Sequence, residues 1–206
     1  MQEVISTREP ERHFALKTED LNSKKSKCRL KVEVHVLTVA MKLSPAKRIH
    51  FTELIDKGRN DRVKFLVMTL VGPSLDVIRK KMGKTNFSKP TAVNIGIQSL
   101  EAIRQLHRIG FIHRDIKPSN FAIGHEPQNQ SNIYILDFGI SRKHLGVSRS
   151  PLVPKELGRL GVYINSLKYC EEPDYAFFVD SMKHLSKEHH IDLNQKFDWL
   201  PVKKKK

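Results

Sequence analysis

The chain has 206 residues, enough for one domain, or one domain of two lobes, with a hydrophobic core. With 39% hydrophobic and 29% charged residues it is not a disordered chain, and its longest apolar run, "FLVMTLVG", is too short to span a bilayer. The formal net charge of +15 indicates either a solvated lysine-rich surface or acidic partners, without the interleaved aromatic residues that would favour nucleic acid.

The N-terminal third contains one predicted helix between β-type segments. Residues 12–19, "RHFALKTE", alternate in character, which predicts a strand. Residues 28–44 predict a helix that Pro45 ends. Its apolar residues at helical spacing are Leu30, Val34, Leu37 and Met41. Residues 63–72 form a β-rich apolar run that the Gly-Pro pair at 72–73 ends.

The rest of the chain is mainly helical in pattern. A short helix is predicted at 74–82 and a long one at 88–110, with Ser88 as its N-cap and Pro90 in its first turn. The predicted apolar stripe of the long helix is Val93, Ile97, Leu100 and Leu106. Two short strands follow, around "FAI" and "IYILDFG", and then a weakly patterned C-terminal part. Strands first and helices later predict an α+β fold with a reduced β lobe at 1–71, a shortened, mainly helical lobe at 72–200 and a disordered basic tail at 201–206.

The peptide "FIHRDIKPSN" carries an unusual density of polar groups between two apolar ends. Asp115, Lys117 and Asn120 have the spacing of the phosphoryl-transfer motif H-R-D-x-x-x-x-N. In such a loop the aspartate orients a substrate hydroxyl and accepts its proton, the lysine neutralises the γ-phosphate and the asparagine holds Mg²⁺. Asp137-Phe138-Gly139, after the apolar "IYIL", matches the magnesium-binding D-F-G motif. Two motifs in this order point to ATP-dependent phosphoryl transfer.

At this point the sequence resembles the eukaryotic protein kinases, within them the casein kinase 1 group, and most closely its tau-tubulin kinase-like branch. The stretches "HRDIKPSNFAIG", "LDFGISR", "GPSL", "SLKYCEEPDY" and "FDW" carry this resemblance, which extends from about Phe14 onward. It implies a two-lobe protein-kinase-like fold, with ATP and Mg²⁺ as ligands. Because Lys117 is the serine/threonine form of the loop, it also implies serine or threonine acceptors.

The resemblance extends the site upstream. "FALK" is similar to the family's V-A-I-K, so Lys17 would grip the α- and β-phosphates, and Glu33 would be its ion-pair partner on the following helix. Met68 would be the gatekeeper, with the backbone of Thr69 and Val71 facing adenine. Two alanines, Ala15 and Ala122, would sandwich the adenine ring. The resemblance also places His113, Phe138 and Leu37 in an internal hydrophobic stack.

Several of these residues have a plain structural alternative. Lys17 on a strand could be an ordinary exposed lysine, and Glu33 could be a solvated helix flank. Met68 could be simple core, and His113 a satisfied core histidine. The three histidines without metal-ligand spacing, which are expected to be structural or exposed, are His107, His189 and His190.

The pattern departs from the family in two places. The earliest glycine is Gly58, so residues 1–10 can supply only the strand that follows the family's glycine-rich loop. After "DFGISRKHLG", which ends at Gly146, the rest of the family's activation segment and the central helix of its C-terminal lobe are largely missing. This loss predicts exposed apolar faces on the long helix and unpaired loop amides. It also predicts loss of the family's anion-binding site for acidic or phosphorylated substrates.

Three hypotheses remain open from the sequence. The chain is a serine/threonine kinase for protein substrates that are acidic or phosphorylated, or a catalytically impaired binding module, or a partial splice or gene-model product. Cys28 and Cys170 make no disulfide framework, and the first residues contain no apolar signal segment. We therefore expect an intracellular setting, cytoplasmic or nuclear.

Overall fold

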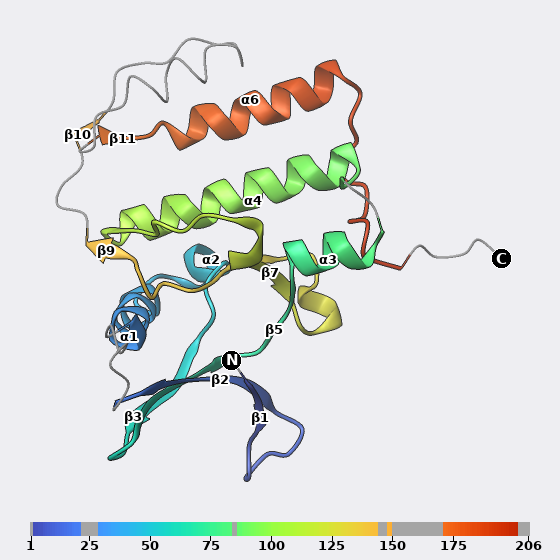
Figure 1. Cartoon of the computed structure of the whole chain (residues 1–206). Coiled ribbons are helices and arrows are strands. Elements are labelled where there is room, and N and C mark those ends of the chain that lie inside the picture. The colour runs from blue at the N-terminus through green and yellow to red at the C-terminus, as the bar shows by residue number, and fades with distance from the viewer. Residues whose placement is uncertain (1, 22–28, 84–85, 144–147, 150–170, 202–206) are drawn as a thin grey trace.

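The computed structural model describes residues 2–21, 29–83, 86–143, 148–149 and 171–201. Figure 1 shows a four-stranded sheet at one end of the molecule and two long helices, side by side, at the other. The sheet is antiparallel in the order β1-β2-β4-β3. Its strands are β1 (Gln2–Ile5), β2 (His13–Asp20), β3 (Leu54–Arg59) and β4 (Val63–Thr69). The strand predicted at 12–19 is therefore confirmed within one residue.

Helix α1 (Arg29–Ala40) packs against this sheet. Its buried face, at helical spacing, consists of Leu30, Glu33, Val36, Leu37 and Ala40. The prediction that Pro45 ends this helix is wrong, because α1 stops at Ala40 and Pro45 begins the short helix α2 (Pro45–Arg48). Proline lacks an N–H, which the first turn of a helix does not need, so it suits the start of α2.

The Gly-Pro pair at 72–73 lies inside a strand, contrary to the prediction that it ends one. The run at 63–72 is divided at Leu70, and β5 (Val71–Ser74) follows. A second sheet, in the order β5-β7-β8, joins it to β7 (Phe121–Gly124) and β8 (Ile133–Ile135). Proline is tolerated here because β5 is an edge strand with an irregular register. Glycine is required beside it because a Cβ at position 72 would lie 2.8 Å from the Gly124 carbonyl oxygen.

Three helices dominate the rest of the described chain. Helix α3 (Leu75–Lys81) has Ser74 as its N-cap, and α4 (Lys89–Arg108) has Ser88, whose hydroxyl accepts a hydrogen bond from the Thr91 N–H. Both predicted helices are thus confirmed. The weakly patterned C-terminal part contains α6 (Tyr175–Glu188), which lies along α4.

Helix α4 has apolar side chains on two faces. The buried residues are Thr91, Ala102, Gln105 and Leu106, so of the predicted stripe only Leu106 is buried. The other face meets α6, where a Cβ on Gly96 would lie 3.0 Å from the Met182 methyl group. Among the described residues, no large apolar side chain of α4 is exposed. The expected bare faces are therefore not found, because α6 covers the helix.

The "FDW" stretch anchors the end of the described chain to the start of α4. The Asp198 carboxylate accepts hydrogen bonds from the Ser88 N–H (2.7 Å) and the Thr91 hydroxyl (3.0 Å). The Trp199 indole donates to the Gln130 carbonyl oxygen at 3.0 Å and stacks on Phe197. These contacts give the motif a structural role.

Short elements complete the described architecture. Strand β6 (Phe111–Ile112) pairs with β9 (Arg142–Lys143), and β10 (Ser148–Arg149) pairs with β11 (Glu171–Glu172). Two 3₁₀ turns are η1 (Pro118–Asn120) and η2 (Pro127–Asn129). Both cysteines, the region at 144–147 and 150–170, and the tail from 202 lie outside the described residues. Within the described ranges, no helix combines the length and apolar character that crossing a membrane requires.

Candidate functional site

Lys17 and Glu33 form an ion pair between β2 and α1. Lys17 Nζ lies 2.7 Å from Glu33 Oε1, and the two side chains are 21% and 5% exposed. Asp137 Oδ1 lies 3.9 Å from the same ammonium group. The prediction that Lys17 and Glu33 pair is confirmed as geometry, and the alternatives of an exposed lysine and a solvated glutamate are wrong.

Burial shapes the electrostatics of this pair. Removal from water raises the pKa of the Glu33 carboxyl above its ordinary value, while the charge and hydrogen bond of Lys17 act in the opposite direction. The carboxylate therefore depends on Lys17 to remain ionised. The ion pair itself joins α1 to β2.

The polar residues of the "FIHRDIKPSN" peptide form a second cluster. Asp115 Oδ2 lies 2.7 Å from Lys117 Nζ, and Asn120 Nδ2 donates to the same carboxylate at 2.9 Å and to the Asp115 carbonyl at 2.8 Å. The hydrogen bonds from Lys117 and Asn120 hold the pKa of the Asp115 carboxyl below its ordinary value. Asp115 is therefore an ionised, oriented acceptor at neutral pH.

The backbone joins this loop to the D-F-G segment. The Leu136 N–H donates to the Asn120 carbonyl oxygen at 2.9 Å. His113, which is buried, donates from Nε2 to the Leu136 carbonyl at 2.9 Å, and its Nδ1 accepts the Asp115 N–H at 3.2 Å. One histidine thus ties the residue before Asp137 to Asp115.

Two residues at this junction have left-handed backbone conformations. The φ angles of Arg114 and Asp137 are +70° and +64°, a region that non-glycine residues seldom adopt. The Arg114 guanidinium donates from Nε to the Ile140 carbonyl oxygen at 2.6 Å. Such strain persists only where the surroundings hold it, and it is typical of functional sites. The motif letters alone did not reveal this role of Arg114.

The predicted internal stack is present and larger than the sequence indicated. Leu37 and Phe138 are buried in the main core, and the Phe138 ring meets the His113 ring edge-on at 5.5 Å. Phe51 stacks on Phe138 at 6.0 Å, and the neighbouring His50 donates to the Ile133 carbonyl at 2.8 Å. Sequence reasoning missed both because "IHFTE" matches no motif and has no clear period.

The residues predicted to surround adenine lie on β2 and β4 of the four-stranded sheet and on β5 and β7 of the second sheet. The chain passes from one sheet to the other at Leu70. Ala15 pairs with Met68 across β2 and β4, and both are buried in the core. Val71 and Ala122 are buried on the paired strands β5 and β7. Thr69 is half-buried at the end of β4, where its N–H donates to the Glu53 carbonyl at 3.1 Å. Apart from Thr69, these side chains are apolar and buried.

A cavity of about 440 Å³ opens beside the charged groups, between β1, β2 and the start of α1, and Lys17, Glu33 and Asp137 are part of its lining. No cluster of three or more histidine, cysteine or acidic ligands occurs within the described ranges. Magnesium bound with a nucleotide needs only one or two protein oxygens, because phosphates and water complete its octahedron. The Asp137 carboxylate, which is 57% exposed, and the amide oxygen of Asn120, whose nitrogen is engaged with Asp115, fit that need.

Comparison with known proteins agrees with this arrangement. The family model described as "Protein kinase domain" matches residues 3–154. "Putative serine/threonine-protein kinase ZK507.3" of Caenorhabditis elegans is 39% identical over 157 residues, which are 74% of this chain and 42% of that protein. "Putative serine/threonine-protein kinase ZK507.1" of the same organism is 40% identical over 165 residues, or 80% of this chain and 49% of that protein.

The chain is also similar to a yeast protein over a shorter region. "Casein kinase I homolog 1" of Saccharomyces cerevisiae is 38% identical over 88 residues, which are 42% of this chain and 16% of that protein. The chain spans about half the length, or less, of the curated relatives that it matches. The H-R-D and D-F-G motifs and the Lys17–Glu33 pair fall inside the matched region, and the chain belongs to the protein kinase family, with casein kinase I proteins among its relatives.

Proposed function

We propose that this chain carries the phosphoryl-transfer centre of a serine/threonine protein kinase of the casein kinase 1 group. The reaction moves the γ-phosphate of ATP to a serine or threonine hydroxyl of a protein. One observation carries the proposal: the Leu136–Asn120 backbone hydrogen bond and the His113 bridge join the Asp115 loop to Asp137, which lies 3.9 Å from Lys17. These contacts support the proposal because they connect three motifs that are far apart in sequence.

Each charged residue has a distinct role in this proposal. Asp115 is ionised and held by Lys117 and Asn120, so it orients the acceptor hydroxyl and takes up its proton. Lys117, half-exposed beside it, neutralises the transferred phosphate. Lys17 binds the α- and β-phosphates, and the buried Glu33 keeps its ammonium group in place. Catalysis of this kind depends mainly on position and charge.

The remaining assignments concern ligands. Asn120 and Asp137 hold Mg²⁺, which supplies positive charge against the phosphate oxygens. Ala15 and Ala122 enclose the adenine ring, Met68 is the gatekeeper, and the backbone of Thr69 and Val71 faces the base. The part up to residue 71 thus binds most of the nucleotide, and residues 72–200 carry the transfer groups.

The protein substrates are acidic or phosphorylated in this proposal. The net charge of +15 supports this preference, because a strongly basic protein attracts acidic partners. Since the reaction uses ATP, we propose an intracellular setting, cytoplasmic or nuclear.

The test measures transfer from γ-labelled ATP with Mg²⁺ to casein, an acidic protein. Wild type and Asp61→Asn, a change at an exposed turn, should transfer label, and Asp115→Asn should not. Transfer that survives Asp115→Asn would remove Asp115 from the proposed role. Equal inactivity of all three proteins would contradict the kinase proposal for this chain.

A second measurement separates nucleotide binding from transfer. At a hundred times its dissociation constant, Mg-ATP should stabilise the folded chain by about 2.7 kcal/mol. The shift in melting temperature should be absent in Lys17→Met. A shift without transfer would favour a catalytically impaired binding module.

A further inference from the structure

A second cavity lies outside the site, between the N-terminal half of α1 and the strands β3 and β4. Its volume is about 260 Å³, and its lining is mainly apolar. Leu30 and Val34 of α1 form one wall, and the β3–β4 hairpin around Gly58 forms the other. We call this cavity the basic pocket because of the side chains at its edge.

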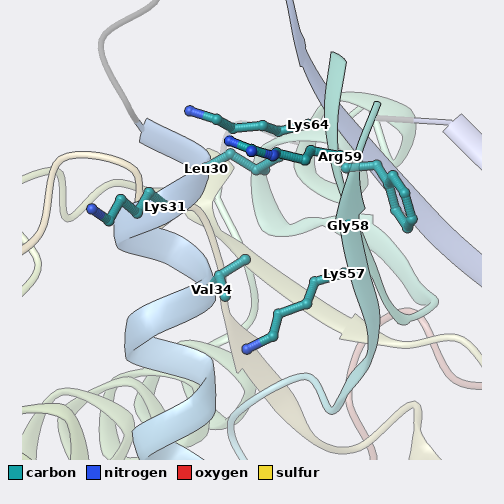
Figure 2. A pocket seen from close by; sticks show the side chains of 8 residues that line it. Leu30, Lys31, Val34, Lys57, Gly58, Arg59 and Lys64 are labelled. Carbon is teal, nitrogen blue, oxygen red and sulfur yellow. The ribbon is translucent and has the colours of Figure 1, made fainter. Parts of the chain in front are cut away.

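Four cations surround the basic pocket. They are Lys31 on α1, Lys57 and Arg59 on β3, and Lys64 on β4. Figure 2 shows the side chains of Lys57, Arg59 and Lys64 extending from the strands toward α1. No carboxylate is part of the lining.

These cations have no ion-pair partner among the residues that the structure describes. Glu19 lies opposite Lys64 in the sheet, but no ion pair joins the two side chains, and the Glu19 carboxylate accepts the Arg29 N–H at 3.0 Å. Other cations of the chain do find partners, such as Arg48 with Glu53 and Arg104 with Glu101. The basic pocket is thus a concentration of positive charge without ion pairs, where like charges repel one another.

The combination of charge and apolar wall narrows the class of ligand. A small inorganic anion would satisfy the cations and make no use of the apolar lining. A nucleic acid would need a free aromatic face for its bases, whereas the Phe65 ring packs over Gly58, where a Cβ would lie 2.6 Å from it. A peptide with an apolar side chain between carboxylates or phosphates matches both features.

We propose that the basic pocket docks an acidic peptide segment of a partner protein. An apolar anchor side chain of this segment enters between the α1 wall, Leu30 and Val34, and the β3–β4 hairpin, and its anionic groups lie against Lys57, Arg59 and Lys64. The proposal goes beyond phosphoryl transfer and does not depend on it. Because α1 also carries Glu33, the docked segment contacts the helix that holds Lys17 in place.

The test uses the full chain and a fluorescein-labelled probe peptide with a central Phe-Leu pair flanked by glutamates. Binding is measured by fluorescence anisotropy in wild type, in Lys57→Glu/Arg59→Glu and in a matched control, Lys183→Glu/Lys187→Glu. Both variants change the net charge equally at exposed positions, but the control pair lies on α6, far from the basic pocket. Hydrogen exchange of wild-type β3 and β4 amides, with and without the peptide, locates binding without any substitution.

We expect the pocket variant to bind the peptide more weakly by on the order of tenfold, and the control variant to stay close to wild type. A peptide with serines in place of Phe-Leu should also bind weakly, and the β3–β4 amides should gain protection. Equal loss in both variants would mean attraction to net charge alone and would overturn the proposal. A serine peptide that binds as well, or a short RNA that competes at this pocket more tightly, would overturn it too.

Discussion

Removal of Lys17 should destabilise the fold as well as any activity. In Lys17→Met the Glu33 carboxyl, only 5% exposed, loses its ion-pair partner. Breaking a buried pair in this way costs about 3 kcal/mol, near the low end of the usual range because the lysine itself is 21% exposed. Against a typical total stability of about 5–15 kcal/mol, this loss is easily measured.

The penalty should depend on pH, and its sign follows from Glu33. Burial already raises the pKa of this carboxyl above 4.5, and loss of Lys17 removes the main opposing effect. A carboxyl whose pKa is raised on folding costs stability as the pH rises above its unfolded value. The difference between wild type and Lys17→Met should therefore be larger at about pH 8 than at about pH 5.

Urea denaturation, followed by the fluorescence of the single tryptophan, Trp199, measures this difference. The double variant Lys17→Met/Glu33→Gln removes the isolated charge and should recover much of the lost stability. A penalty that is equal at both pH values, or that the double variant does not reduce, would refute the buried-pair reasoning.

Three further effects should follow from the same structure. Burial lowers the pKa of His50 and His113 below 6.5, so both should contribute stability above that pH that is lost as the pH falls below it. The urea midpoint should therefore decline as the pH is lowered in a Glu33→Gln background, which removes the carboxyl that has the opposite pH dependence. A midpoint that does not change with pH would contradict this prediction. Asp198→Ala should lower stability by about 1–3 kcal/mol, seen as a reduced melting temperature, because the Ser88 N–H and the Thr91 hydroxyl at the start of α4 lose their acceptor. Gly124→Ala should cost about 1–3 kcal/mol in urea denaturation, since its Cβ would lie 2.2 Å from a backbone oxygen, and an unchanged midpoint would refute that contact.

The chemistry-bearing residues were predictable because their spacing is set by local loop geometry. Asp115, Lys117 and Asn120 lie within six positions of one another, so one loop conformation fixes all three. Ser88 was identified as a helix cap from the residue type alone, and its hydrogen bond to the Thr91 N–H is present. The catalytic, nucleotide-binding and metal roles of these residues stay predictions until the activity is measured.

Predictions from local sequence pattern were wrong where tertiary packing decides between two possible structures. The Gly-Pro pair at 72–73 has the character of a turn, but the close approach of β7 to an edge strand makes it part of a sheet. The apolar residues of α4 fit either of two faces, and only contact with α6 and the core decides which residues each partner covers.

The sequence by itself determined the motif residues, most helices and the family, since these depend on neighbours within a few positions. Only the tertiary structure decided that Phe51 would stack on Phe138, that His113 would join two loops and that four cations would surround one apolar pocket. Such contacts join residues far apart in the chain. Their energies depend on distance and burial in space, which no local spacing records.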